Sequence, residues 1–301
     1  MKILLLGKDG QVGWELQRAL APLGELRMLG RAEADFDQPE SLRACARDYA
    51  PDVIVNAAAY TAVDRAESDT DTAERVNAIA PGVLAEEAAA CGAWLVHYST
   101  DYVFDGSKEG AYVESDTTHP LSVYGRTKCE GEERIRASGA RHLILRTSWV
   151  FAARGGNFAR TMLRLAKERE QLNVIADQHG APTSAELIAD ATALALHSIR
   201  DAGPAGPAMS GTYHLVAAGA TTWHGYAQYV LEQALAHGAQ LKAGPQQVQP
   251  IATEAYPTPA ARPRNSRLDT HRFQTTFGLQ LPDWRHHVNR LIAELAAQGQ
   301  L

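Results

Sequence analysis

The sequence predicts an α/β fold, a doubly wound parallel sheet followed by a smaller and irregular α/β domain. Short apolar runs alternate with longer amphipathic stretches through the first half of the 301-residue chain. Such continuous apolar runs are typical of parallel strands that are buried on both faces. A glycine-rich turn follows the first run, and the regular alternation ends near residue 150. These observations favour a sheet with crossover helices on both sides.

The first half supplies the elements of this sheet in order. Apolar runs at residues 3–7, 25–29, 52–59, 93–99 and 142–148 are the expected strands. The stretches at 11–20 and 73–92 have the composition of helices, and Gly92 stands at the expected C-cap of the second. Residues 1–150 are therefore expected to form the first domain.

The second half is less regular. A helix is expected at 157–170 and a short strand at 172–177, whereas 201–211 is a Pro/Gly-rich connector. The proline-rich stretch 255–269 is expected to be mostly extended loop. Residues 151–301 are thus predicted to form mainly a substrate-binding domain, with segments of about 171–223 returning to the first domain.

Composition excludes several classes of function. The formal net charge is −6, and no run is rich in Lys or Arg, so a nucleic-acid partner is not expected. Three cysteines without a C-x-x-C spacing argue against a disulfide framework or a zinc site and suit the reducing cytoplasm. No apolar stretch approaches the roughly 20 residues of a membrane span, and the short first run fits a buried strand better than a signal peptide.

The turn after the first strand has the pattern G-x-x-G-x-x-G. Glycines there allow a sharp turn and a close approach of the backbone to a pyrophosphate, which the free amides of the following helix can bind. The alternative is a glycine turn that serves packing alone. The expected cofactor-binding residues of this turn are Gly7, Asp9, Gly10, Gln11, Val12 and Gly13.

The end of the second strand bears on the choice of cofactor. An acidic residue there usually binds the ribose hydroxyls of NAD, whereas a basic residue favours the 2′-phosphate of NADP. Arg31 occupies this region and favours NADPH, with NADH as the alternative if Arg31 is only a solvated surface residue. Asp35 and Phe36 are expected to flank the adenine.

Tyr124 and Lys128 are four residues apart in a stretch that Ser122 is expected to cap as a helix. Their side chains therefore share one face of that helix. A tyrosine has an ordinary pKa near ~10, and a neighbouring ammonium would lower it and so favour the phenolate. The pair is a candidate for acid–base catalysis, although the spacing alone also arises by chance in helices.

Several motifs together carry a resemblance to a known family. They are "GKDGQVGWELQ", "VIVNAAAYTAVDRAE", "HYSTDYVFDG", "YGRTK", "LRTSWVF", "DQHGAPT", "YHL" and "RPRNSRL". The chain resembles the extended short-chain dehydrogenase/reductase superfamily, and within it the dTDP-4-dehydrorhamnose reductase family. The resemblance covers nearly all of the chain, including its irregular second half.

The resemblance implies a Rossmann fold and the reduction of a dTDP-linked 6-deoxy-4-ketohexose at C4 by NADPH or NADH, to give dTDP-L-rhamnose. Tyr124 would protonate the forming alkoxide, and Lys128 would hold the nicotinamide ribose and lower the pKa of Tyr124. Thr100 would bind the substrate carbonyl or Tyr124, with Ser99 as the rival for this role.

Other positions follow from the same resemblance. Ala57, Ala58, Ala59 and Tyr60 are expected beside the cofactor, together with Tyr124 and Lys128. Trp149 could equally be a core residue, and Arg262 a solvated one. The residues expected to contact the substrate are Val63, Asp64, Thr100, Tyr102, Phe104, Trp149 and Arg262.

Members of this family are associated with Mg²⁺, for which hydride transfer leaves no obvious task. The hypothesis is a structural ion bound by Glu15, Glu186 and Glu294 where two subunits meet, since Mg²⁺ prefers oxygen ligands. A homodimer is therefore expected. The alternative is that the three glutamates are simply solvated on helix surfaces.

Two rival functions stay open. A nucleotide-sugar epimerase or dehydratase would use the same scaffold, but the dehydratases carry a Glu two residues after the catalytic Thr, where this chain has Tyr102. A regulatory subunit similar to that of methionine adenosyltransferase would bind the cofactor without catalysis. Its case is weakened because Thr100, Tyr124 and Lys128 are all present.

Overall fold

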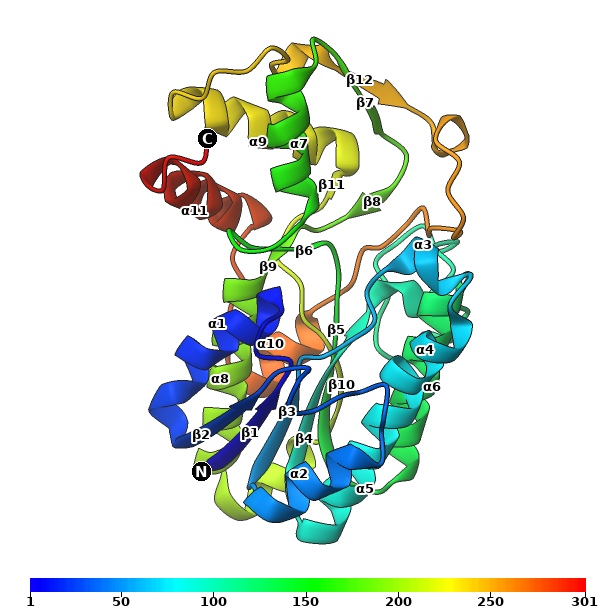
Figure 1. Ribbon diagram of the computed structural model, residues 1–301, viewed down its shortest axis with the longest axis vertical. Coiled ribbons are helices and arrows are strands. Elements are labelled where there is room, and N and C mark those ends of the chain that lie inside the picture. Colours follow the sequence, from blue (N-terminus) through cyan, green and yellow to red (C-terminus); the bar gives the residue numbers. More distant parts are fainter.

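The structure is a computed structural model that describes residues 1–301. A sheet domain occupies the lower part of the molecule and a smaller body lies above it (Figure 1). The sheet has six parallel strands in the order β10-β5-β4-β3-β1-β2. Its strands are β1 (Lys2–Leu6), β2 (Glu25–Leu29), β3 (Val53–Asn56), β4 (Trp94–Thr100), β5 (Arg141–Thr147) and β10 (Gly211–His214).

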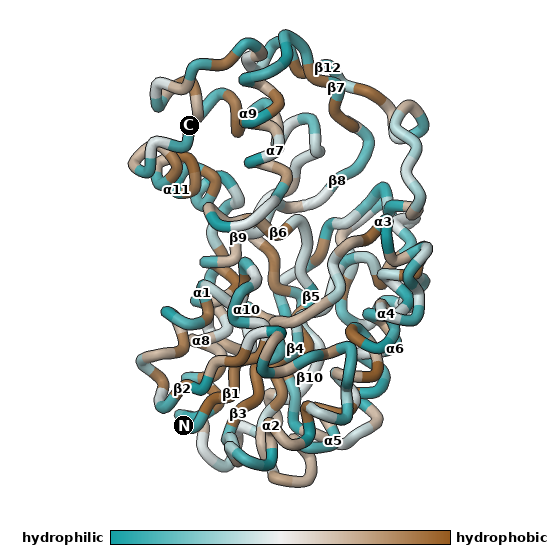
Figure 2. Tube along the Cα trace, in the orientation of Figure 1, coloured by the Kyte–Doolittle hydropathy of each residue, from teal (hydrophilic) through white to brown (hydrophobic).

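The central strands are buried along their length because both faces of the sheet are covered. Every residue of β3 and β4 is buried, and β1 and β3 are among the most hydrophobic parts of the chain (Figure 2). The order of strands reverses at β1, which has β2 on one side and β3 on the other. A crevice for a ligand is expected outside the carboxyl ends of the strands at such a point. The predicted fold class is confirmed.

Helices cover the two faces of the sheet in separate layers (Figure 1). One layer contains α1 (Gln11–Leu20) and α8 (Ala185–Asp201), which pack against each other. The other contains α2 (Ser41–Tyr49), α5 (Ala80–Cys91) and α6 (Val123–Ala137). Each layer forms its own hydrophobic core with one face of the strands.

The helix predicted at 73–92 is interrupted near its start. It consists of α4 (Thr70–Glu74), a π-helical turn η2 (Arg75–Ile79) and α5, and Gly92 caps it in the left-handed conformation with φ 70°. The predicted cap is confirmed. A π-turn is rare and often marks a functional site, and this one presents Asn77 to the loop after β3.

The second body is built from three helices and short strand pairs. Asn157 caps its first helix by accepting from the amide of Arg160 at 3.1 Å. Strands β7 and β12 pair in parallel, and β8 pairs with β11. The elements are α7 (Phe158–Glu168), β7 (Leu172–Ile175), β8 (His179–Gly180), β11 (Thr221–Thr222), α9 (Trp223–Ala236), β12 (Val248–Ile251) and α11 (Trp284–Ala297).

The chain returns to the sheet domain twice after residue 150 and forms three elements there. The returning elements are α8, β10 and α10 (His271–Phe277), which packs against both. The 172–177 strand lies in the second body instead, since β7 pairs with β12. The returning segments therefore begin later than the expected residue 171.

Short elements complete the description. The pair β6 (Val150–Phe151) and β9 (Thr183–Ser184) links the two bodies, and α3 (Val63–Ala66) follows β3. None of the helices combines the length and the apolar character that crossing a membrane requires. The 3-10 helices are η1 (Ala21–Leu23), η3 (Asp101–Val103), η4 (Gly203–Met209), η5 (Pro245–Gln247) and η6 (Thr253–Ala255).

Candidate active site

A cavity of about 460 Å³ opens at the carboxyl ends of β1, β2 and β3. Its position at the reversal of strand order is the one expected for a dinucleotide. Most of the predicted cofactor residues line it, namely Gly7, Asp9, Gly10, Arg31, Asp35, Phe36, Ala57, Ala58, Ala59 and Tyr60. Gln11, Val12 and Gly13 do not, and neither do Tyr124 and Lys128.

The glycines of the first turn fit a dinucleotide cradle. Gly7 has a φ of +83°, and a Cβ there would lie 2.6 Å from the amide nitrogen of Ala58. A Cβ on Gly13 would lie 2.0 Å from the carbonyl oxygen of Gly7. Gly10 differs, because its Cβ would meet nothing closer than 3.6 Å. Packing therefore requires glycine at residues 7 and 13, whereas residue 10 leaves room for a ligand at the start of α1.

Two basic residues stand near the end of β2. The ammonium of Lys8 is held by Glu33 at 2.9 Å, and Glu33 also accepts from the amide of Gly30 at 2.6 Å. Arg31 lines the cavity with a side chain that is 85% exposed, and its only acidic neighbour is Asp35 at 3.9 Å. Arg31 is therefore the basic group that remains available to a 2′-phosphate.

Sequence reasoning missed one residue that shapes this cavity. Asn77, on the π-turn, accepts from the amide of Tyr60 at 2.9 Å and donates to its carbonyl at 3.1 Å. It also donates to the hydroxyl of Thr127 at 3.3 Å. Asn77 thereby fixes the loop after β3 against α6, a link that no motif indicates. The lining residues that were not expected are Gly30, Ala34, Asp37, Arg65, Asp69, Thr72 and Val76.

The two hydroxyls at the end of β4 have different partners. Ser99 donates to the buried carboxylate of Glu132 at 2.6 Å. Thr100 donates to Asp101 at 3.0 Å and accepts from the amide of Tyr102 at 3.2 Å. Burial raises the pKa of Tyr124, and the nearby hydroxyl of Thr100 opposes this rise. The geometry thus favours Thr100 over Ser99 as the partner of Tyr124.

Tyr124 lies in the first turn of α6. Ser122 caps this helix by accepting from the amide of Gly125 at 3.2 Å, as predicted. The ring of Tyr124 meets Tyr102 edge-on, with ring centroids 5.5 Å apart. Burial of the hydroxyl raises the pKa of Tyr124 to about 12. The phenol is therefore fully protonated at neutral pH.

Lys128 does not act on Tyr124 as expected. Its ammonium nitrogen lies 2.6 Å from the carbonyl oxygen of Tyr98 and 3.0 Å from Nε2 of His97. Burial lowers the pKa of Lys128 to about 7, against the opposing effect of Glu132. The expected lowering of the Tyr124 pKa is thus wrong for this arrangement, because Lys128 points toward β4 and burial dominates at Tyr124.

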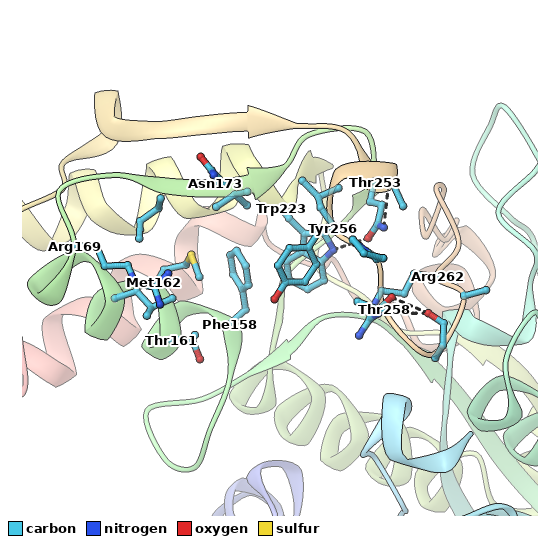
Figure 3. A pocket seen from close by; sticks show the side chains of 18 residues that line it. Phe158, Thr161, Met162, Arg169, Asn173, Trp223, Thr253, Tyr256, Thr258 and Arg262 are labelled. Carbon is cyan, nitrogen blue, oxygen red and sulfur yellow. Dashed lines mark hydrogen bonds between the residues drawn. The ribbon is translucent and has the colours of Figure 1, made fainter. Parts of the chain in front are cut away.

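A second cavity, of about 580 Å³, lies in the second body (Figure 3). Its wall is formed by α7, β7, the start of α9 and the loop that follows η6. Trp223, Phe158 and Tyr256 provide aromatic surface, while Gln178, Asn173 and Arg262 provide polar groups. Of these residues the sequence indicated only Arg262.

Arg262 connects this cavity to the catalytic residues. It donates to Asp64 at 2.8 Å, and the amide of Ala260 donates to the same carboxylate at 3.3 Å. The dashed lines beside Arg262 in Figure 3 mark the hydrogen bonds that Arg262 and Thr258 donate to the carbonyl of Ala260. Asp64 follows Val63 at the start of α3, next to the loop of Tyr60. Arg262 therefore joins the wall of the second cavity to α3, which follows the loop of Tyr60.

Two aromatic residues expected at the substrate lie elsewhere. Phe104 is buried and stacks on Tyr112 with centroids 4.1 Å apart, so its prediction as a substrate contact is wrong. Trp149 stacks on Trp223 at 3.6 Å and packs over Gly180. It supports the cavity wall from behind and does not line it.

The three glutamates predicted to bind magnesium are near one another but form no site within one chain. Glu186 and Glu294 both raise the pKa of Glu15, in addition to the larger effect of burial. Glu186, however, is paired with Arg290 at 3.0 Å. No group of three His, Cys, Asp or Glu residues has a geometry that could hold a metal ion. The magnesium prediction therefore finds no support in the single chain.

Comparison with known proteins gives a consistent picture. The family model described as "RmlD substrate binding domain" matches residues 1–297. A dTDP-4-dehydrorhamnose reductase of Shigella flexneri is 54% identical over 98% of both chains. The enzyme of that name from Escherichia coli K12 is 53% identical over the same shares.

A solved structure is similar to this chain in both fold and length. The dTDP-4-dehydrorhamnose reductase of Bacillus anthracis, in complex with NADP, has a TM-score of 0.88 and 32% identity. The match covers 98% of this chain and 100% of that one. By sequence and by structure, this chain belongs to the RmlD family, the family of the dTDP-4-dehydrorhamnose reductases.

Proposed function

We propose that the chain reduces the C4 keto group of dTDP-4-dehydro-L-rhamnose to give dTDP-L-rhamnose, with NADPH as the preferred reductant. One observation carries this proposal. Thr100 ends β4, beside the strand β3 whose carboxyl end opens into the dinucleotide cavity, and Tyr124 packs on Tyr102, which lies close enough to Arg262 of the second cavity for the two to interact. A cofactor in one and a nucleotide sugar in the other would meet at these two hydroxyls.

The residues around these two hydroxyls have distinct tasks. A bound nicotinamide cofactor supplies the hydride. Tyr124 holds the proton that the sugar oxygen needs, and its raised pKa of about 12 keeps that proton in place at neutral pH. Thr100, fixed by Asp101 and the amide of Tyr102, orients the hydroxyl of Tyr124. Lys128 would hold the nicotinamide ribose after turning from His97.

The second cavity suits the nucleotide part of the substrate. Its aromatic residues, Phe158, Trp223 and Tyr256, offer flat apolar surface to a base. Arg262 offers a guanidinium to a diphosphate, in the fork geometry that favours such groups. Asp64 holds this guanidinium at 2.8 Å and so sets its direction before substrate binds.

The rival functions are less well supported. Elimination by a dehydratase needs an acid at the position of Tyr102, whose ring packs against Tyr124. A regulatory subunit needs no acid at residue 124, and no aromatic and cationic cavity in the second body. Both features are present here.

The test is to mix the purified chain with NADPH and dTDP-6-deoxy-L-lyxo-4-hexulose and to follow the absorbance of the reduced cofactor. The proposal expects loss of that absorbance in step with formation of dTDP-L-rhamnose. Binding of NADPH without its oxidation would favour the regulatory subunit. Conversion of the sugar without net oxidation of NADPH would favour an epimerase or a dehydratase.

We also infer that two copies associate through the surface of α1, α8 and α11. Three glutamates raise charge density there, since Glu186 and Glu294 act on the half-buried Glu15. A second copy would bring its own glutamates to this surface, so basic side chains or a cation at the contact would have to offset the repulsion. Mass in solution, measured with Mg²⁺, with chelator and for Glu15→Gln, tests the inference. A monomer under all three conditions would contradict it.

A further inference from the structure

A continuous chain of buried polar contacts leads from the cofactor cavity to Lys128. The amide of Ala58, which lines the cavity, donates to Oδ1 of Asn56 at 3.1 Å. Nδ2 of Asn56 lies 3.0 Å from Nδ1 of His97, and Nε2 of His97 lies 3.0 Å from Nζ of Lys128. Asn56, His97 and Lys128 are each only 1% exposed.

The backbone amide of Ala58, at one end of this series of contacts, sets the orientation of Asn56. A backbone amide can only donate, so the group of Asn56 that faces Ala58 must be its carbonyl oxygen. The amino group of Asn56 therefore faces His97. Because an amide NH₂ is a donor, Nδ1 of His97 must be the acceptor.

This orientation determines the protons of His97 and Lys128. An imidazole that accepts at Nδ1 carries its proton on Nε2, and burial lowers the pKa of His97 well below its ordinary value, which keeps it neutral. The Nε2–H group then points at Nζ of Lys128. An ammonium has no lone pair, so the 3.0 Å contact is a hydrogen bond only if Lys128 is an amine.

The other contacts of Lys128 are consistent with an uncharged amine. It keeps a proton to donate to the carbonyl of Tyr98 at 2.6 Å. Burial lowers the pKa of Lys128 to about 7. A lysine near this value loses its proton readily, whereas an exposed lysine would not.

No unpaired acid holds Lys128 in its charged form. Glu132, one turn further along α6, raises the pKa of Lys128 but is bound by Arg146 and Arg136. Tyr124 is a protonated phenol, and Asp101, which accepts from Thr100, is not among the groups that shift the pKa of Lys128. The charged groups on the other elements around α6 have partners of their own, namely Asp64 with Arg262, Asp69 with Tyr60, Arg75 with Asp37, and Glu87 with Arg47.

We propose that His97 and Asn56 hold Lys128 as an uncharged amine, and that Lys128 takes up one proton from solvent when it turns to the ribose of a bound nicotinamide cofactor. The proposal rests on the proposed function, in which Lys128 holds that ribose. His97 and Asn56 are thus positioning residues. Cofactor affinity should then fall as the pH rises above about 7, the pKa of Lys128, because each binding event takes up a proton.

Calorimetry of NADPH binding at pH 8 tests this proposal. The binding enthalpy is measured in phosphate and in Tris, whose different ionisation enthalpies reveal how many protons are exchanged. The 2′-phosphate, with a second pKa of about 6, is already ionised at this pH. We expect uptake of about 0.9 proton per NADPH bound, the fraction of a group with pKa about 7 that is neutral at pH 8.

Three variants show which residue takes up the proton when NADPH binds. Lys128→Met should bind NADPH with no proton uptake. His97→Gln offers a carbonyl that accepts from an ammonium, so uptake should fall below half and NADPH should bind up to about tenfold tighter at pH 8. A purely structural histidine would give weaker binding instead. Tyr98→Phe is the control, because its hydroxyl contacts Thr192 and Lys128 uses only its carbonyl; its uptake should be unchanged.

The position of the proton on His97 gives a second test, which is independent of NADPH binding. Two-bond ¹H–¹⁵N spectra of the free enzyme should show the Nε2–H form of His97, with the signal assigned by its absence in His97→Gln. The Nδ1–H form, NADPH binding with no buffer dependence, or full uptake in Lys128→Met would overturn the proposal. Absence of any NADPH binding would instead contradict the proposed function.

Discussion

The hydroxyl of Thr100 donates a hydrogen bond to the carboxylate of Asp101 across 3.0 Å. Since a hydroxyl has only one proton, Thr100 can accept from Tyr124 but has no proton left for a sugar oxygen. Tyr124, with a pKa raised to about 12, therefore remains the proton donor of this pair. This division of roles underlies the first two predictions.

Tyr124→Phe removes the acid and keeps the ring against Tyr102. We expect turnover to fall roughly 10²–10⁴-fold, the range for loss of a positioned acid, while NADPH binds as before. Steady-state kinetics and calorimetry measure the two effects. Tyr229→Phe is the matched control, because its hydroxyl contacts Asn289 in the second body. More than about half of the original turnover in Tyr124→Phe would refute the assignment.

Asp101→Asn should stabilise the fold and impair the reaction. Asp101 is 2% exposed, its Oδ2 has no hydrogen-bond partner, and burial raises its pKa from 3.8 to about 6. An acid whose folded-state pKa is raised binds protons more strongly when folded, so stability falls as the pH rises from about 4 to 6. The cost of the charge at pH 7 is about 3 kcal/mol.

Urea unfolding at pH 7 measures this effect. We expect a higher midpoint for Asp101→Asn and a lower one for Asp105→Asn, because hydrogen bonds from Ser107 lower the pKa of Asp105. Turnover of Asp101→Asn should drop, since a neutral amide accepts more weakly from Thr100. A destabilised Asp101→Asn would show that the buried carboxylate is better satisfied than its contacts indicate.

Gly10→Ala and Gly13→Ala should separate binding from folding. A Cβ at residue 10 meets nothing closer than 3.6 Å, so Gly10→Ala should keep its melting temperature and lose cofactor affinity. A Cβ at residue 13 would lie 2.0 Å from Gly7 O, so Gly13→Ala should destabilise the fold by about 1–3 kcal/mol. Thermal melting measures the stability of each variant, and titration with NADPH measures its cofactor affinity. If Gly10→Ala and the parent chain bind NADPH with equal affinity, the pyrophosphate does not bind at this turn.

Arg31→Asp should shift the preference from NADPH toward NADH. A charge-assisted contact to the 2′-phosphate contributes about 1.5–3 kcal/mol, and its reversal adds repulsion. The readout is the ratio of kcat/KM for the two cofactors. Arg164→Asp, on α7 and away from the dinucleotide cavity, should leave that ratio unchanged. If both substitutions behave alike, Arg31 does not bind the phosphate.

Arg262→Gln should weaken binding of the nucleotide sugar and spare the cofactor. Loss of one charge-assisted pair predicts a rise in KM of about ten- to a hundredfold. Arg267→Gln is a control from the same loop, because its guanidinium contacts Asn265 and Glu109. Competition by dTDP alone distinguishes the partners of Arg262. Unchanged inhibition by dTDP in Arg262→Gln would place the diphosphate elsewhere.

The sequence predicted the sheet because burial on both faces leaves a direct mark in it. All five expected strands form within a few residues of their expected limits, since a parallel strand such as β4 is buried along its whole length and is therefore mostly apolar where it begins. It did not predict β10 or α10. Both join the sheet domain from late in the chain, through contacts that local patterns do not record.

The candidate site was predicted only where one segment carries it. Gly7, Gly10, Tyr124 and Lys128 lie in short motifs whose spacing has a direct geometric meaning. The second cavity joins α7, β7, α9 and the 255–262 loop, which are distant in sequence, so only Arg262 was found. Phe104 was misplaced because its burial against Tyr112 depends on how residues 105–116 fold back.

The most direct test of Tyr124 as the acid in a C4 reduction is to trace the transferred hydrogen. The chain is incubated with dTDP-4-dehydro-L-rhamnose and NADPH deuterated on one face of C4 of the nicotinamide, then with the other isotopomer, and the sugar is examined by NMR. We expect deuterium at C4 of dTDP-L-rhamnose from one isotopomer only, and at least a hundredfold less product from Tyr124→Phe at equal NADPH occupancy. Deuterium absent from C4 of the sugar, or equal product from Tyr124→Phe, would contradict the reduction at Tyr124.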